Sequence, residues 1–240
     1  MKEILSARSI TKAFDKNIIF KDLDISLEEG ETLALLGPSG IGKTTLMNIL
    51  SGVLAPDSGN VFLKGEDITS KPGHISYMQQ KDLLLPYYTV IENVALPLII
   101  KGEKKKNAIE KVEGYFDFFG ISGYENKYPR EMSGGMKQRA ALLRAFIQSE
   151  GVLLLDEPFG ALDAVTRNKL QKWYIEISKE MKLSTVIITH DTDEALILAD
   201  RIIVMNNASA VKEISIYDKC KEYELTEDFL KKKKEILGYL

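Results

Sequence analysis

Cysteine is nearly absent from this sequence, because Cys220 is the only one among 240 residues. A single cysteine excludes an internal disulfide and is typical of proteins in a reducing compartment. Long apolar runs are missing as well. Residues 95–100 are the most tempting candidate for a span, but they are short, contain Pro97 and are followed by Lys101, so no bilayer-spanning helix is expected. The first residues lack the apolar core of a signal peptide, and none is predicted.

An excess of positive charge is also missing. The formal net charge is −3, which gives no reason to expect nucleic acid as a main partner. Hydrophobic residues make up 45% of the chain and charged residues 28%, as in ordinary globular proteins. A chain of this length buries a sizeable core, so we expect one large domain, or one domain with a substantial insertion.

A glycine-rich stretch lies between an apolar run at residues 32–36 and a helical pattern at residues 45–50, with the spacing G-x-x-x-x-G-K-[ST]. Its residues are Gly37, Pro38, Ser39, Gly40, Ile41, Gly42, Lys43, Thr44 and Thr45. At such a strand–loop–helix turn, backbone N–H groups and the positive end of the helix hold phosphates. Lys43 then reaches the β- and γ-phosphates, and the Thr44 hydroxyl binds Mg²⁺. The stretch therefore predicts a nucleoside triphosphate site.

Two carboxylates end a second apolar run. Residues 151–155 are typical of a strand buried on both faces of a parallel sheet, and Asp156 and Glu157 follow them. Ligands bind beyond the carboxyl ends of such strands. Asp156 is therefore placed to hold Mg²⁺, and Glu157 to accept a proton from an attacking water. An ordinary polar turn is the alternative, weakened by the phosphate loop.

Two further strand ends carry candidate groups. His190 follows the apolar residues 183–189, where it can hydrogen-bond a γ-phosphate and the attacking water. Gln79 and Gln80 follow residues 75–78, where an amide can bind Mg²⁺ or the attacking water. A purely structural histidine and a surface-loop amide are the alternatives.

Ser133, Gly134 and Gly135 open a helical pattern that runs to Gln148. Ser133 is a good N-cap, and a helix N-terminus with two glycines can hold an anion, although a capped helix without a ligand is favoured by this motif alone. Phe14 and Phe20 are the aromatic residues near the N-terminus. Either could stack on an adenine ring, or both could belong to a sheet core.

The middle of the chain changes character. An apolar, aromatic loop at residues 82–88 precedes a charged stretch and then a helical periodicity of Ile109, Val112, Phe116 and Phe119. We expect a helical insertion at about residues 86–146 of an α/β domain formed by residues 1–85 and 147–240. Residues 4–36 predict short strands. The lysine runs at 104–106 and 231–234 predict solvated helix faces.

Together these motifs resemble the ATP-binding subunit of an ABC transporter over essentially the whole chain. The resemblance identifies the phosphate loop as Walker A, and Gln80 as the Q-loop residue, since Leu-Leu-Pro follows it at the family's distance. It assigns the other motifs as follows: signature Ser133, Gly134, Gly135 and Gln138; Walker B Asp156; catalytic Glu157; D-loop Ala161, Leu162 and Asp163; switch His190; adenine-stacking Phe14. The departures, Met132, Met136 and Gly160, are mild.

The resemblance implies a P-loop NTPase of the ABC ATPase type: a parallel-sheet core, an N-terminal antiparallel β subdomain and an inserted helical subdomain. It implies ATP and Mg²⁺ as cofactors, with Lys43, Glu157 and His190 in catalysis. Two copies would pack head to tail, with each ATP between one phosphate loop and the partner's Ser133 loop. Residues 83–88 would dock a transmembrane permease, which would place the protein at the cytoplasmic face of the membrane.

A narrower placement of the chain among the subgroups of this family rests on shorter segments. Residues 132–139, 156–163 and 190–201 resemble nitrate/sulfonate/taurine-type importers, a group that also takes bicarbonate and vitamin precursors and works with an extracytoplasmic solute-binding protein. Residues 89–98 instead resemble lipoprotein-release and macrolide-export ATPases. The importer is favoured because its matching segments are longer and lie in separate regions, and the absence of a regulatory domain by residue 240 also suits it. A soluble ABC protein that moves no solute is the third alternative.

Overall fold

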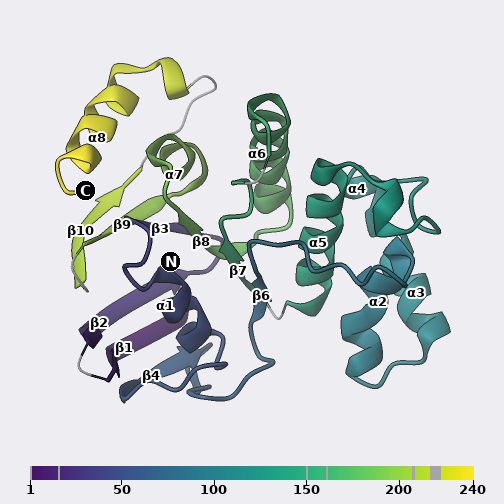
Figure 1. Ribbon diagram of the computed structural model, residues 1–240, viewed down its shortest axis with the longest axis horizontal. Coiled ribbons are helices and arrows are strands. Elements are labelled where there is room, and N and C mark those ends of the chain that lie inside the picture. Colours follow the sequence, from purple (N-terminus) through teal and green to yellow (C-terminus); the bar gives the residue numbers. More distant parts are fainter. Residues whose placement is uncertain (1, 16, 150, 161, 207–208, 217–222) are drawn as a thin grey trace.

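In the computed structural model, two β-sheets form one part of the molecule and a group of helices extends from it (Figure 1). The residues described are 2–15, 17–149, 151–160, 162–206, 209–216 and 223–240. Ala161 of the predicted D-loop and the sole cysteine, Cys220, lie outside them. Among the described helices, none is long and apolar enough to cross a membrane.

The smaller sheet is antiparallel and has the order β2-β1-β4-β5. Its strands are β1 (Glu3–Phe14), β2 (Asn17–Glu28), β4 (Ser58–Leu63) and β5 (Glu66–Asp67). The expectation of short strands at residues 4–36 was wrong for β1 and β2, which have 12 residues each. The β1–β2 pairing contains register shifts, and Ser9 and Asp22 have positive φ angles of 50° and 49°. Such bulges interrupt the two-residue alternation by which a long strand is recognised.

The larger sheet has the order β10-β9-β3-β8-β7-β6. Its strands are β3 (Thr32–Leu36), β6 (Ser76–Met78), β7 (Val152–Asp156), β8 (Ser184–Thr189), β9 (Arg201–Asn206) and β10 (Ser209–Ser215). All neighbours pair in parallel except β10, which runs antiparallel to β9. The carboxyl ends of β3, β6, β7 and β8 therefore lie at one edge, and the predicted parallel core is confirmed.

Both faces of the larger sheet are covered, which explains its continuous apolar strands. Along β7, Leu154 packs toward α1 (Lys43–Leu50) and the antiparallel sheet, whereas Leu155 packs toward α5 (Gly134–Gln148) and α6 (Ala164–Glu180). In β3, near the middle of the sheet, Leu36 packs with residues of α7 (Thr192–Leu198), η2 (Tyr223–Leu225) and α8 (Glu227–Leu237).

The helical part lies to the right in Figure 1 and contains α2 (Val90–Ile100), α3 (Lys105–Glu113), α4 (Tyr115–Phe118) and η1 (Pro129–Glu131), which lead into α5. The predicted periodic face is buried, since Val112, Phe116 and Phe119 share a core with α5 and α6. Gly114 separates α3 from α4. An inserted helical subdomain is thus present, and its limits at 86–146 stay a prediction.

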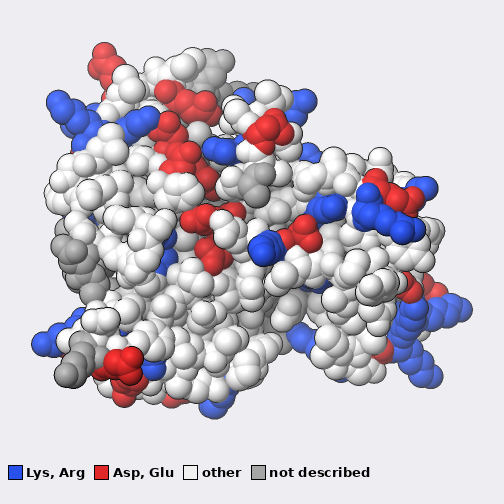
Figure 2. Space-filling view, in the orientation of Figure 1, with Lys and Arg blue, Asp and Glu red and all other residues white. Residues whose placement is uncertain are grey.

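Charged side chains of both signs are distributed over the face shown in Figure 2, and basic ones gather at the outer end of the helical part, near α3. Residues 104–106 are all exposed, as expected for a solvated helix start. They are also partly neutralised, because Lys105 pairs with Glu92 at 2.5 Å and Lys106 with Glu110 at 3.9 Å. This cluster is therefore an ordinary charged helix face.

Candidate functional site

The phosphate loop connects β3 to α1, and its conformation depends on glycine at position 42. Gly42 caps α1 with φ of 105°, in a region that favours glycine. A Cβ there would lie 2.4 Å from Ile19 Cγ2 and 2.9 Å from Phe20 Cζ. The loop thus packs directly on β2, and Phe20, fully buried in that core, is a core residue and not an adenine platform.

A cavity of about 250 Å³ opens over this loop. It is lined by the loop and by the carboxyl ends of β7 and β8: Ser39, Gly40, Gly42, Lys43, Thr44, Thr45, Asp156, Glu157 and Ile188. Three separate segments of the sequence, two of them predicted motifs, therefore meet at one concave site beside the N-terminus of α1, where backbone N–H groups and the helix dipole favour an anion.

Lys43 supplies the cation of this cavity. Its side chain is 6% exposed, and its Nζ donates to the carbonyl oxygens of Gly37 and Pro38 at 2.7 and 2.8 Å. Burial lowers the pKa of Lys43, while the nearby Glu157 and Asp156 carboxylates oppose that shift. The ammonium is held within the loop that the sequence predicts to cradle phosphates.

Asp156 lies across the cavity from α1, and its Oδ2 accepts hydrogen bonds from Thr44 Oγ1 at 3.1 Å and from the Tyr77 hydroxyl at 3.2 Å. Burial raises the pKa of Asp156, and both hydroxyl donors act in the opposite direction. Tyr77 was not predicted from the sequence. The signal was its place in a strand that ends beside the Asp156 strand, since Tyr77 of β6 is aligned with Leu154 of β7.

Glu157 is the centre of a second group. Its N–H donates to the Ile188 carbonyl at 3.0 Å, and its φ of 45° is unusual for a residue other than glycine. Its Oε1 lies 3.0 Å from His190 Nδ1, and its Oε2 accepts from Gln80 Nε2 at 2.9 Å. Three side chains from the ends of β6, β7 and β8 therefore meet. Gln80 contacts Glu157 and does not line the cavity, so its predicted metal contact stays a prediction.

The remaining predicted residues do not line this cavity. Phe14 ends β1 with 47% of its surface exposed, and Lys12 Nζ lies 5.4 Å from its ring centroid. Ser133 caps α5, as predicted, because its Oγ accepts from the Met136 N–H at 3.3 Å. Asp163 caps α6 through its Oδ1.

Gly134 and Gly135 lie where α5 approaches α6 and the segment before it. A Cβ at Gly135 would lie 2.9 Å from Thr166 Cγ2, and one at Gly134 would lie 3.7 Å from Leu162 Cδ2. Gln138, one turn into α5, is buried and donates to the Pro158 carbonyl, just after Glu157. The start of α5 is thus joined to the segment that carries the carboxylates.

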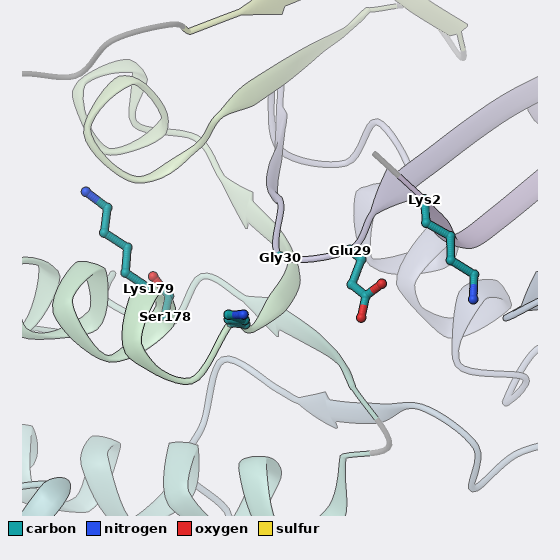
Figure 3. A pocket seen from close by; sticks show the side chains of 6 residues that line it. Lys2, Glu29, Gly30, Ser178 and Lys179 are labelled. Carbon is teal, nitrogen blue, oxygen red and sulfur yellow. The ribbon is translucent and has the colours of Figure 1, made fainter.

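A second and larger concavity lies elsewhere, near the start of β3 and the end of α6 (Figure 3). Lys2 and Glu29 lie on one side of it and Ser178 and Lys179 on the other, and Gly30 and Lys182 complete the lining. It is at the amino end of β3, away from the strand ends that hold the motifs. No motif of the sequence predicts a site there.

Residues 20–160 match the sequence profile of the ABC transporter family. The chain belongs to this family. Among its relatives, the formylaminopyrimidine import ATP-binding protein ThiZ of Halalkalibacterium halodurans is 39% identical over 86% of this chain and 81% of its own length. The sulfate/thiosulfate import ATP-binding protein CysA of Synechococcus elongatus is 39% identical over 89% of this chain. The spermidine/putrescine import ATP-binding protein PotA of Spiroplasma citri is 39% identical over 86%. This chain, which we call the cassette, spans only 64% and 60% of the length of these last two relatives.

Solved structures show the same fold. The cassette resembles an ATP-binding cassette of an ABC transporter in its ADP conformation, with a TM-score of 0.82 and 26% identity over 99% of both chains. It also resembles a dimeric cassette in a post-hydrolysis state bound to ADP and Pi, with a TM-score of 0.77 and 26% identity over 90% of this chain and 100% of that chain. The predicted ABC ATPase fold is confirmed, and the cassette is an ATP hydrolase of this family.

Proposed function

We propose that this cassette is the ATP-hydrolysing subunit that powers solute import by an ABC transporter. The observation that carries the proposal is the meeting of Glu157, His190 and Gln80 at the edge of the phosphate-loop cavity. A carboxylate held from two sides beside an anion site is what activation of a water near a γ-phosphate requires. A small-molecule kinase with the same phosphate loop would need neither His190 nor the Ser133 loop.

In the proposed reaction, a water attacks the γ-phosphate in line with the departing ADP oxygen. Glu157 accepts a proton from that water or polarises the water. His190, which is hydrogen-bonded to Glu157, orients both the water and the phosphate. Lys43 offsets the negative charge of the phosphate oxygens from within the loop. The hydrogen bonds from Gln80 and His190 fix the Glu157 carboxylate before the substrate arrives.

The residues around Asp156 fit a magnesium ion. Mg²⁺ prefers oxygen ligands, and the Thr44 hydroxyl and the Asp156 carboxylate lie 3.1 Å apart at the cavity wall. When bound, Mg²⁺ would neutralise charge on the phosphate oxygens. Thr44 and Asp156 would hold it, and the hydrogen bond from the Tyr77 hydroxyl would orient the carboxylate.

A second copy of the cassette completes the proposed ATP site. Phe14, Ser133, Gly134, Gly135 and Asp163 are predicted to bind nucleotide, yet none of them lines the cavity of the single chain. In a head-to-tail pair, the start of α5 from one copy would meet the γ-phosphate held by the other, with Asp163 beside it. Phe14, exposed at the end of β1, would stack on the adenine of its own site.

Residues 83–88, which we call the docking loop, are proposed to bind a transmembrane permease. Their large apolar side chains are exposed, by 52% at Leu83, 38% at Leu85, 92% at Tyr87 and 42% at Tyr88. Exposed apolar clusters of this kind mark interaction sites. Leu84 was predicted to belong to this surface, which was wrong, because Leu84 is 8% exposed and packs in the core.

Import is favoured over export because the relatives cited above are import proteins by name. Sulfate is an anion and spermidine a cation, yet the cassette is equally identical to both relatives at 39%. Overall identity to these relatives therefore does not indicate the solute. We propose the nitrate/sulfonate/taurine/vitamin-precursor type, an extracytoplasmic solute-binding protein as a further partner, and a location at the cytoplasmic face of the membrane. Nucleic acid is not a proposed partner.

The test is affinity purification of the cassette from detergent-solubilised membranes, with mass spectrometry of what co-purifies. Import predicts a small multi-span permease, encoded beside a solute-binding protein. Recovery of a membrane protein with a large extracytoplasmic domain would favour export or lipoprotein release. Recovery of no membrane protein would favour a soluble ABC ATPase and contradict the proposal.

A further inference from the structure

The docking loop has no helix or strand between β6 and α2, but its backbone is firmly held. Leu84 anchors it to the core, and the exposed side chains flank that anchor. Leu83 has a φ of 46°, in a region that side chains other than glycine seldom adopt. Such a conformation persists only where surrounding contacts impose it. Asp82 Oδ1 supplies one by accepting from the Leu84 N–H at 3.0 Å, and two side chains from helices supply others.

Asn93 is the first of them. It lies in α2, is fully buried, and its Oδ1 accepts from the Leu85 N–H at 2.6 Å. Its Nδ2 donates to the carbonyl oxygens of Leu85 at 3.1 Å, Tyr88 at 3.2 Å and Thr89 at 3.0 Å. One amide therefore satisfies the backbone at both ends of the exposed segment.

Arg144 is the second. It lies in α5, where its Nη1 donates to the Leu83 carbonyl at 2.8 Å and its Nη2 to the Asp82 carbonyl at 2.6 Å. The planar guanidinium holds two consecutive carbonyls in a fixed arrangement, which a lysine ammonium on a flexible stem does not reproduce. Arg144 thereby joins the loop to the helix that Ser133 caps, while Gln80, two residues before Asp82, joins it to Glu157.

We propose that Asn93 and Arg144 are positioning residues that fix the docking loop in the shape that receives the permease. Arg144 also ties that shape to α5, so a displacement of α5 relative to Glu157 is transmitted to the loop. The proposal rests on the docking loop being the permease-binding surface. Neither residue touches the phosphate-loop cavity, so each acts on coupling and not on the bond-breaking step.

The test compares Arg144→Lys and Asn93→Asp with Arg139→Lys as the matched control. Arg139 lies on the same helix and donates to a backbone carbonyl, but to that of Phe119, outside the loop. Hydrogen exchange of the purified full chain measures the protection of the backbone amides at residues 83–85 and 87–89. Both loop variants are expected to exchange there about tenfold faster or more, the factor for one lost hydrogen bond to a charged or buried group. Exchange in R139K should match wild type at these amides.

In the same variants we measure the rate of basal ATP hydrolysis and the amount of permease recovered from solubilised membranes. R144K and N93D should keep basal hydrolysis within about twofold and lose most of the recovered permease, because ordering a loosened loop on binding costs free energy. Unchanged exchange at residues 83–89 would overturn the proposal. Loosened loops with undiminished permease recovery would overturn it as well. If R144K fails to fold, N93D gives the same decision.

Tyr87→Asp separates this inference from the docking proposal itself. Tyr87 is 92% exposed, so the change alters the surface and not the support. If Y87D loses the permease while R144K and N93D retain it, the positioning role is wrong and the docking loop stands. If all three retain it, the docking loop is not the interface, and both proposals fall.

Discussion

Replacing Gly42 with alanine tests how tightly the phosphate loop is built onto β2. The alanine would have to keep a φ of 105°, and its Cβ would lie 2.4 Å from Ile19 Cγ2 and 2.9 Å from Phe20 Cζ. The backbone strain costs about 1–3 kcal/mol. Overpacking against the two buried neighbours costs a further 1–3 kcal/mol or so. We expect G42A to lose about 2–6 kcal/mol of unfolding free energy, or to shift the loop and lose ATP affinity.

Gly40→Ala is the matched control for this prediction. Gly40 also has a positive φ, of 83°, but nothing lies within 4 Å of a Cβ built there. G40A should therefore lose only the unfolding free energy that the backbone strain costs. Urea unfolding with a shared slope gives both free energies, and titration with a fluorescent ATP analogue gives the affinity. If G42A were no more damaging than G40A in both assays, the packing of the loop on β2 would be refuted.

The other predictions concern the cavity, a buried carboxyl and the docking loop. Lys43→Ala should lose ATP affinity in the same titration. Unchanged binding would refute the prediction that Lys43 and its loop hold the ATP phosphates. Burial raises the pKa of Glu194 to about 7 from an ordinary 4.5, so the folded state takes up a proton and stability falls as pH rises through this window. Glu194→Gln should thus gain about 3 kcal/mol on wild type between pH 4 and 8, and parallel unfolding profiles would contradict this. Leu84→Asp should unfold more readily in urea, whereas Tyr87→Asp should not.

Much of the site could be predicted because its groups follow parallel strands. The ends of β6, β7 and β8 carry Gln80, Glu157 and His190, and parallel strands place such ends at one edge whatever their separation in sequence. The glycine spacing of the phosphate loop is equally local. For these groups, order along the chain was sufficient to place them together.

What could not be predicted depends on contacts between segments with no shared pattern. Tyr77 reaches Asp156 across a strand pair, and Arg144 reaches the docking loop from a helix more than sixty residues away. Leu84 was assigned to the exposed surface because its neighbours are apolar too, and only the packing shows which of them points inward. The long strands β1 and β2 were divided because bulges break their alternation.

The most direct test of the central claim is the turnover rate of Glu157→Gln. Glutamine keeps the size of the side chain but cannot accept the proton of the attacking water. Since Glu157 is hydrogen-bonded to Gln80 and His190, which lie outside the phosphate loop, ATP binding should survive. We expect ATP affinity close to wild type, a dimer that accumulates with ATP, and hydrolysis slower by about 100-fold or more. Hydrolysis by E157Q at a rate near wild type would contradict the assignment of Glu157.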